Sequence, residues 1–259
     1  MLKISPLFSG SKGNCTLIQT DKTNILLDLG FGYRAILQAL TERNLTPDDI
    51  DAIIITHDHG DHTCALPMWT KHTSTPVYVP AKLAVSLEKK TCFSQVIPVD
   101  SNFFVKDVVV EIYPCSHDTL CCFGYRICSN QQYFACVTDT GCITDRLVEF
   151  LSPCSAIMLE SNHDVDMLLK GNYSYPLKRR ILSDYGHLSN AQATEILSRL
   201  IGKTPKYVIL AHLSEINNTH ELAFNSVVSM YAAQGLTEGK DVNVYVADQY
   251  KNEITICLD

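Results

Sequence analysis

A dense group of potential metal-binding side chains follows a strongly apolar stretch of the chain. The run Ala52–Ile55 leads directly into Thr56–His62, where three histidines and two aspartates fall within six positions. On an extended chain His57 and His59 point to the same side, and Gly60 is expected to let the backbone turn so that Asp61 and His62 join them. Imidazole and carboxylate groups together suit Zn²⁺, Mn²⁺ or Fe²⁺. We therefore predict a metal site at the end of a buried strand, where α/β proteins place functional residues, rather than an exposed loop that is rich in histidine by chance.

Three further candidate ligands follow apolar runs elsewhere in the chain. His117, Asp139 and His212 each come shortly after a predicted strand. Each would be an ordinary loop residue if taken alone, but their repeated placement makes coincidence a poor explanation. We expect them to complete a dinuclear site, in which two metals about 3.5–4 Å apart activate a bridging water and clamp the attacking and leaving oxygens.

A second motif bears on the substrate. The segment Gly186–Asn190 ends at a predicted helix start, where Ser189 and Gln192 form a capping-box pattern. A helix N-terminus offers free amides to a phosphate group, and His187 can protonate a departing alkoxide. We therefore expect His187 to be catalytic and Ser189 and Asn190 to bind substrate. The alternative is an ordinary capped helix that follows a chance histidine.

The elements that must position these residues alternate between strands and helices, which is typical of a layered α/β fold. A hairpin is predicted from Cys15–Gln19 and Asn24–Leu27, and later helices from Leu177–Ser183 and Ser189–Leu200. One sheet of a sandwich is expected from a meander of five strands: Gln95–Val99, Phe103–Val105, Val108–Tyr113, Cys121–Cys128 and Tyr133–Val137. No composition break or Pro/Ser-rich linker divides the chain, so we expect residues 1–259 to form a single domain.

Composition sets limits on partners and location. With 46% hydrophobic and 19% charged residues, the 259-residue chain is typical of a globular protein. Its formal charge of −7 differs from the basic surplus of nonspecific nucleic-acid binders, so a polyanion would have to be held locally. No stretch has the length of a membrane span or the form of a signal peptide. Eleven cysteines without a C-x-x-C pair favour a reduced, cytoplasmic protein.

The pattern His-x-His-x-Asp-His after an apolar strand resembles the signature of the metallo-β-lactamase fold superfamily. This resemblance implies a four-layer αββα sandwich and assigns the ligands. One metal would take His57, His59 and His117, and the other would take Asp61, His62 and His212, with Asp139 bridging the two. It also implies that Asp61 is part of the catalytic group. Asp28 matches an early aspartate of the superfamily that supports the metal loops from the second shell, although an aspartate that ends a strand at a Gly turn explains it almost equally well.

Four stretches together resemble the YycJ/WalJ family: Ser9–Cys15, Glu160–Asp164, Gly186–Asn190 and His212–Asn218. The resemblance extends from Phe8 to about Ala223. It implies a phosphodiesterase, foremost a 5′→3′ DNA exonuclease, with single-stranded or 5′-ended DNA as its partner. Two alternatives remain: a phosphodiesterase for cyclic phosphates or nucleotides, and a non-catalytic, metal-stabilised module that binds DNA ends.

Several other polar residues have weaker assignments. Glu160, Asn162 and His163 follow a predicted strand and are expected to line the cleft, where His163 is expected to bind substrate. The alternatives for His163 are a third catalytic histidine and a polar residue that supports the fold. The basic run Lys178–Arg180 is a candidate guide for a phosphate backbone or a solvated helix face. His72 and His220 are expected to be surface or packing residues.

Overall fold

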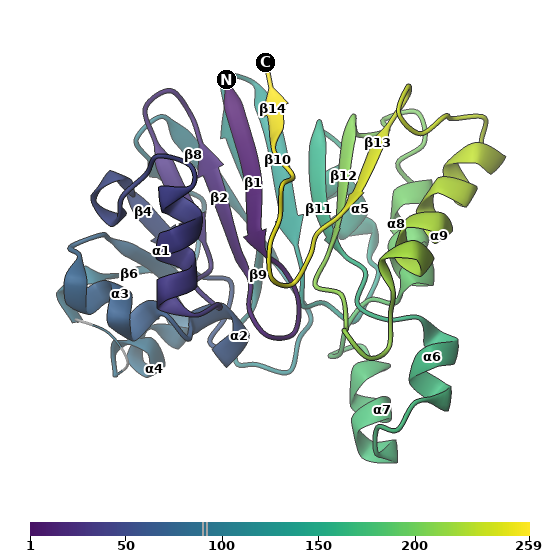
Figure 1. The fold of residues 1–259 in the computed structure, drawn as a ribbon, viewed down its shortest axis with the longest axis horizontal. Coiled ribbons are helices and arrows are strands. Elements are labelled where there is room, and N and C mark those ends of the chain that lie inside the picture. The colour runs from purple at the N-terminus through teal and green to yellow at the C-terminus, as the bar shows by residue number, and fades with distance from the viewer. Residues whose placement is uncertain (90, 92) are drawn as a thin grey trace.

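The computed structural model describes residues 1–89, 91 and 93–259, and these build two facing β-sheets with helices on both outer sides (Figure 1). Each sheet has seven strands within the described residues. The first sheet contains, in spatial order, β14 (Ile256–Leu258), β1 (Leu2–Phe8), β2 (Cys15–Gln19), β3 (Asn24–Leu27), β4 (Ala52–Ile54), β5 (Val77–Pro80) and β6 (Val96–Val99). The second contains β13 (Asn243–Val246), β12 (Tyr207–Ala211), β11 (Ala156–Glu160), β10 (Gln132–Val137), β9 (Phe123–Ser129), β8 (Val108–Pro114) and β7 (Phe103–Val105).

The helices cover the two outer faces, which confirms the predicted four-layer αββα sandwich. Those beside the first sheet are α1 (Tyr33–Thr41), α2 (Gly60–Thr63), α3 (Leu66–His72) and α4 (Ala84–Glu88). Those beside the second sheet are α5 (Asp145–Leu151), α8 (Asn190–Ser198) and α9 (His220–Ala233), while α6 (Val165–Lys170) and α7 (Tyr175–Ile181) lie beyond the ends of the strands. Short 3₁₀ turns occur at Pro47–Asp49, Ala81–Leu83 and Phe93–Gln95. Among the described residues, none of the helices combines the length and the apolar character that crossing a bilayer requires.

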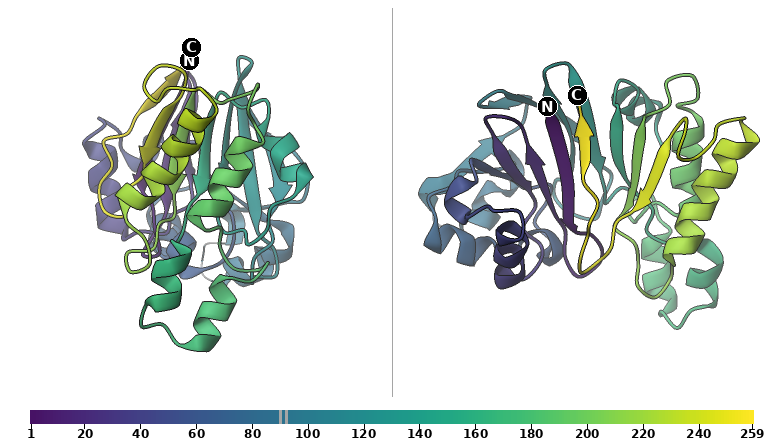
Figure 2. Two further views of the ribbon diagram at one scale, coloured as in Figure 1. Left: turned by 90° about the vertical axis from the view of Figure 1, so that its right-hand side faces the viewer. Right: turned by 45° about the horizontal axis from the view of Figure 1, so that its top comes forward.

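Both faces of the central strands are buried, which explains their continuous apolar sequences. In β3, Ile25 and Leu27 point into the core between the sheets, while Leu26 points outward to the layer of α1 and α3. In β11, Met158 belongs to the core between the sheets and Ile157 packs toward α8 and α9. The right view of Figure 2 shows the two sheets edge on, with a helical layer on either side.

The predicted five-strand meander is divided between the two sheets, which corrects the expectation of a single sheet. β6 pairs in parallel with β5 at the edge of the first sheet, and the chain then crosses so that β7 pairs with β8 in the second. Ile97 and Pro98 of β6 are exposed, and an edge position tolerates a proline. The apolar pattern of a short strand shows which face is buried, but it does not show which sheet the strand joins.

Helix boundaries in the second half also differ from the prediction. α7 begins at Tyr175 rather than Leu177, because Pro176 is suited to the first turn of a helix. α6 was not predicted at all. The α8 prediction is closer: Ser189 caps this helix through its side chain, which accepts a hydrogen bond from the backbone of Gln192.

Candidate metal centre

The predicted ligands meet at one edge of the sandwich, beyond the ends of strands from both sheets. The register of the parallel strands β10, β11 and β12 aligns Val137, Leu159 and Leu210, so the residues that follow them emerge side by side. Three site residues at these strand ends have the left-handed backbone that non-glycine residues rarely adopt: Asp28 (φ 60°), Asp139 (φ 57°) and His212 (φ 56°). The side chains of Asp139 and His212 reach across the edge to His62 and Asp61, which follow a strand of the first sheet. The Asp28 side chain instead contacts His62 and Thr56 next to its own sheet.

His57, His59 and His117 form the first group. The ring centroids of His57 and His59 are 4.6 Å apart, and those of His57 and His117 are 5.1 Å apart. His117 Nε2 lies 3.3 Å from His59 Nδ1. One nitrogen of each ring lies within 4.8 Å of the others, so the three side chains can share one ion.

Asp61, His62 and His212 form the second group. Asp61 Oδ2 lies 3.3 Å from His212 Nε2 and 3.6 Å from His62 Nε2. The carboxylate of Asp61 is 24% exposed, while both histidine rings are buried. The structure thus brings together the same two groups of three that the family resemblance implies.

Asp139 lies between the two groups. Its Oδ2 is 3.2 Å from His62 Nε2, and its Oδ1 is 3.8 Å from His117 Nε2. Oδ1 is also 3.6 Å from the Nδ1 atoms of His187 and His212. A carboxylate in this position can contact an ion on either side.

The donor atoms fit divalent transition metals in spacing and chemistry. Nitrogen and oxygen ligands at about 2.0–2.2 Å from a tetrahedral ion stand roughly 3.3–3.6 Å apart, close to the separations around Asp139. His57 Nε2 and Asp139 Oδ2 are buried and have no hydrogen-bond partner among the described residues. Since buried polar atoms are normally paired, both atoms favour an ion as the missing partner.

The histidines of the two groups differ in the protonation state that their surroundings favour. Burial lowers the pKa of His57 and of His117, which keeps these rings in the neutral form that binds metal. Burial also opposes charge on His62, but the carboxylates of Asp139 and Asp28 raise its pKa to about 10. These carboxylates therefore favour the protonated form of His62 when no metal is bound, and a cation would compete with that proton.

Asp28 and Thr56 support the ligand loop, residues 56–62, through hydrogen bonds. Asp28 Oδ2 is 2.8 Å from His62 Nδ1, and Asp28 Oδ1 accepts a hydrogen bond from the Thr56 backbone. Thr56 Oγ1 lies 3.0 Å from His57 Nδ1. Asn14, which was not predicted as a site residue, places its amide nitrogen 3.1 Å from His62 Nε2. The supporting role of Asp28 stays a prediction, and its contacts with Thr56 and His62 favour that role.

Gly60 does not have the conformation that was expected of it. Its φ is not positive, and a Cβ atom at this position would meet no atom within 4 Å. Gly30 is the close contact instead, because a Cβ there would lie 1.6 Å from the carbonyl oxygen of Asp61. The turn that brings in Asp61 and His62 is therefore fixed by packing on Gly30, not by the freedom of Gly60.

Glu160 has a more specific place than the sequence indicated. Its Oε1 lies 2.8 Å from His187 Nδ1 and 3.0 Å from His212 Nδ1. Its Oε2 accepts hydrogen bonds from the backbone amides of Leu188 and Thr140. The signal in the sequence was a carboxylate at the end of the apolar strand β11, but the two histidines that it contacts are 27 and 52 residues away.

His187 lies at the surface of the centre, with its side chain 18% exposed. The other residues predicted to bind substrate are buried behind it: Ser189, Asn190 and His163. Ser189 caps α8, and Asn190 Oδ1 accepts a hydrogen bond from Ser161. Their contact with substrate stays a prediction, and their burial favours a supporting role.

The remaining histidines and the basic run lie outside the metal centre. His72 stacks on Tyr33 with ring centroids 5.9 Å apart, and exposed His220 is 3.8 Å from Asp248. Lys178–Arg180 lies on α7, and Arg180 forms an ion pair with Asp118.

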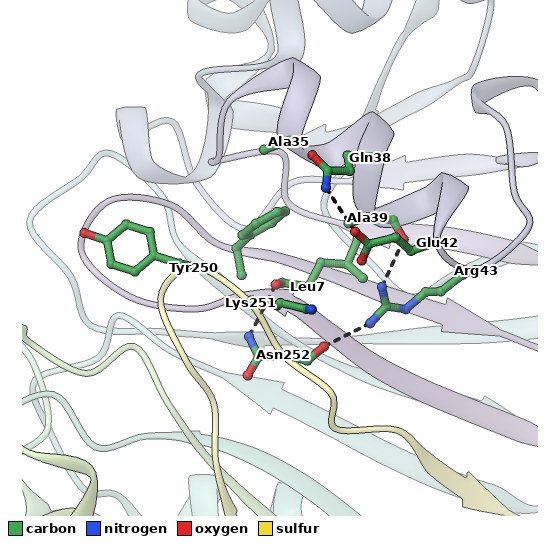
Figure 3. Close-up of a pocket in the computed structure, with 10 residues that line it drawn as sticks. Leu7, Ala35, Gln38, Ala39, Glu42, Arg43, Tyr250, Lys251 and Asn252 are labelled. Carbon is green, nitrogen blue, oxygen red and sulfur yellow. Dashed lines mark hydrogen bonds between the residues drawn. The ribbon is translucent and has the colours of Figure 1, made fainter.

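A pocket between α1 and the C-terminal loop is separate from this centre (Figure 3). Its volume is about 120 Å³, and Arg43 closes one side by donating to the carbonyl oxygens of Ala39 and Asn252. Ligand sites usually measure about 300–1,000 Å³. The pocket is thus too small for a nucleotide, and it contains none of the predicted ligands.

Comparisons with known proteins identify similar sequences and similar folds. Residues 23–213 match the family described as the beta-lactamase superfamily domain. Exodeoxyribonuclease WalJ of Streptococcus pneumoniae serotype 2 (strain D39 / NCTC 7466) is 35% identical over 250 residues, which cover 94% of this chain and 93% of the relative. Exodeoxyribonuclease YycJ of Bacillus anthracis is 34% identical over 255 residues, 95% and 96% of the two chains. In structure, the metallo-beta-lactamase fold protein YhfI from Bacillus subtilis has a TM-score of 0.75 at 16% identity, with 99% of each chain covered.

Proposed function

The chain belongs to the beta-lactamase superfamily and, within it, to the WalJ/YycJ family, and from this premise we propose that it is a metal-dependent exodeoxyribonuclease. The observation that carries the proposal is the convergence of six histidine and aspartate side chains around a seventh, Asp139. The chain also matches two named exodeoxyribonucleases over nearly its full length. The substrate that we propose is single-stranded or 5′-ended DNA, degraded in the 5′→3′ direction.

The metallo-β-lactamase fold implies divalent metal ions, and we propose that this centre holds two. His57, His59 and His117 would hold one ion, Asp61, His62 and His212 the other, and Asp139 would contact both. Nitrogen and oxygen ligation suits Zn²⁺, Mn²⁺ or Fe²⁺. When bound, such ions activate water and offset charge on phosphoryl oxygens.

In this proposal His187 supplies a proton to the leaving oxygen. Its Nδ1 faces Glu160, which leaves Nε2 to approach the substrate. Burial opposes charge on His187, but Glu160 raises its pKa, so the ring keeps the proton that a general acid must carry.

Asp61 acts differently in the same proposal. Burial opposes its charge, but His212 and His62 lower its pKa, so it stays ionised. A weakly basic carboxylate is better suited to orient an attacking water by hydrogen bonding than to accept its proton as a general base.

We further propose that residues 1–259 form one domain and that the protein is cytoplasmic. The pairing of β14 with β1 supports the first point, because it places the last strand beside the first strand, with the two termini close together (Figure 1). The free thiols found among the described cysteines support the second, since they suit a reducing compartment.

The direct test uses metal-loaded protein and 5′-phosphorylated single-stranded DNA. Release of mononucleotides is expected. Asp139→Ala or His59→Ala should reduce the rate at least 100-fold, because each removes a proposed metal ligand. Substitution of a residue that only supports a ligand typically reduces activity by roughly 10–100-fold. His72→Ala, outside the centre, is the matched control. Equal rates for the parent and the Asp139→Ala protein would overturn the proposal.

Two additions to the assay test the finer claims. DNA labelled at either end establishes the direction of digestion, and elemental analysis of the active protein identifies the metals. A panel with bis(p-nitrophenyl) phosphate and a cyclic nucleotide separates an exonuclease from a small-molecule phosphodiesterase by relative kcat/KM. DNA-end binding without turnover would instead identify a binding module.

A further inference from the structure

A helical arm, residues 165–185 with α6 and α7, extends from the edge of the sandwich that carries the metal centre. Figure 1 shows both helices beyond the ends of the strands, on the same side as α2, and the left view of Figure 2 shows them projecting at the bottom. The arm is rich in exposed apolar and aromatic side chains. It holds five of the fifteen large ones among the described residues: Val165, Leu169, Tyr175, Leu182 and Tyr185. Tyr175 is 73% exposed and Tyr185 is 62% exposed, so both rings are open to a ligand.

The charge of the arm is opposite to that of the whole chain. Residues 165–185 carry four basic and two acidic side chains, whereas the complete sequence has a formal charge of −7. The Arg179 guanidinium lies 6.0 Å from the Tyr175 ring centroid, one helical turn away on the same face of α7. A cation beside an exposed ring offers a phosphate contact and a stacking surface together.

The base of the arm is fixed to the metal centre. Arg180 pairs with Asp118, whose Oδ1 is 3.3 Å from His117 Nε2. The backbone amide of His187 donates to the carbonyl oxygen of Ile181 at the end of α7. A strand lying along α7 would therefore be led directly to the proposed proton donor.

We infer that the arm binds the single-stranded DNA that feeds the metal centre, with bases stacked on its tyrosines and phosphates held by Arg179. This inference rests on the proposed function and adds to it a surface for nucleotides beyond the one being cleaved. The paired cation and ring favour a nucleic-acid strand over a protein partner, because an apolar protein interface does not require an arginine beside the exposed Tyr175 ring. Stacking on aromatic rings is tolerant of sequence, as the substrate of an exonuclease requires.

The test compares a long and a minimal substrate. Tyr175→Ala and Arg179→Glu should each raise the KM for a 5′-phosphorylated 30-nucleotide strand about tenfold, which corresponds to loss of one base stack or one phosphate contact. The kcat/KM for bis(p-nitrophenyl) phosphate, which is too short to reach the arm, should stay within about twofold by the same argument. Arg179→Glu should also flatten the dependence of log(kcat/KM) on log[salt] by about one unit.

A matched control lies at the far end of the sheet. Lys206 is 5.2 Å from the Tyr207 ring at the start of β12, whereas His212 follows the other end of that strand. Lys206→Glu makes the same charge change beside a ring and should leave the KM for the long strand unaltered. Both Tyr175 and Arg179 are exposed, so their substitution should not disturb the fold. Unchanged thermal unfolding of the variants checks this expectation.

The outcomes separate this inference from the function on which it rests. If the parent protein does not degrade DNA, the proposed function fails. If the parent degrades DNA but both arm variants keep its KM for the long strand, the inference alone fails. A third outcome is that Tyr175→Ala leaves the KM for the long strand unaltered but abolishes a concentration-dependent dimer in sedimentation. That result would identify the arm as a contact between copies of this chain and would overturn the inference.

Discussion

The Glu160 carboxylate orients two histidines with different roles. Its Oε1 is shared by His187 and His212, while its Oε2 receives the backbone amide of Leu188 next to His187. Burial opposes its charge, but His187 and His212 lower its pKa to about 2, so it is an anion under ordinary conditions. One buried charge thus links the proposed proton donor to a proposed metal ligand.

Replacing Glu160 with glutamine should therefore damage activity more than folding. Glu160→Gln keeps the shape of the side chain but removes the charge, and its amide group can no longer accept hydrogen bonds from both histidines and two backbone amides. We expect kcat on DNA to fall roughly 10–100-fold, as for other outer-shell changes, together with a weaker affinity for metal. The measurements are steady-state kinetics and metal titration. Glu149→Gln, on the exposed face of α5, is the control, and wild-type kinetics in Glu160→Gln would contradict the assignment.

The metal-free protein should lose stability as the solution becomes alkaline. Burial opposes the charge of His62, but Asp139 and Asp28 raise its pKa from 6.5 to about 10. Folding then favours the protonated ring, so the stabilisation is complete below pH 6.5 and disappears as the pH rises to about 10. For Glu160 the pKa is lowered from 4.5 to about 2, so its stabilisation is present above pH 4.5 and is lost toward pH 2.

Urea unfolding of chelator-treated protein checks this expectation. The midpoint concentration should be highest between pH 4.5 and 6.5 and should fall between pH 7 and 10. His62→Gln cannot titrate, so it should flatten the alkaline part of the profile. An alkaline increase in the stability of the parent protein would refute the assignment. Metal affinity should follow the opposite trend, because protons compete with metal for the same nitrogen atoms.

The ligand loop is held by close packing between two segments. Gly30, just after β3, lies against the carbonyl of Asp61, where a Cβ would approach to 1.6 Å. The amide of Leu29 also donates to the carbonyl oxygen of His62. The loop from β3 therefore acts as a template for the segment that carries two of the proposed ligands.

Gly30→Ala and Gly60→Ala should consequently behave very differently. The first forces the Asp61 backbone to move, which should cost about 1–3 kcal/mol of stability, as other overpacking changes do, and should weaken metal binding. The second adds a methyl group in open space at the start of α2 and should leave both properties unchanged. Thermal unfolding and metal titration of the two variants provide the comparison. Equal behaviour would show that Gly30 does not hold the loop.

Features of the fold that depend on a few neighbouring residues could be predicted from the sequence, and features that depend on distant residues could not. The ends of β4, β8, β10 and β12 were predictable because an apolar run followed by histidine or aspartate is a signal within a few residues. The sheet that β6 joins was not, because strand pairing depends on partners far along the chain. α6 has only six residues, too few to show a helical period. The double contact of Glu160 joins segments 27 and 52 residues apart, and no local pattern records it.

The metal centre connects the two halves of the sandwich. His57, His59, Asp61 and His62 follow a strand of the first sheet, whereas His117, Asp139 and His212 follow strands of the second. Away from this edge the sheets are joined by a large apolar core that includes Ile25, Ile54, Phe134 and Met158. Apolar packing therefore joins the layers through the middle, and the proposed ions would join them at one edge.

Removal of the metals should therefore loosen one edge of the molecule without unfolding it. Ligand binding to the folded state stabilises it by about 2.7 kcal/mol at 100 times the dissociation constant, so chelation should lower Tm and re-addition of metal should restore it. Hydrogen exchange should rise in the loops that carry His57–His62 and Asp139, while β3 and β11, whose side chains lie in the apolar core, should stay protected. The Asp139→Ala protein is the control, because loss of the ligand that contacts both ions should make its exchange respond less to the chelator. Loss of protection in the strands of both sheets would contradict this expectation. It would show that the whole sandwich depends on the metals and that the apolar core alone does not keep the two sheets together.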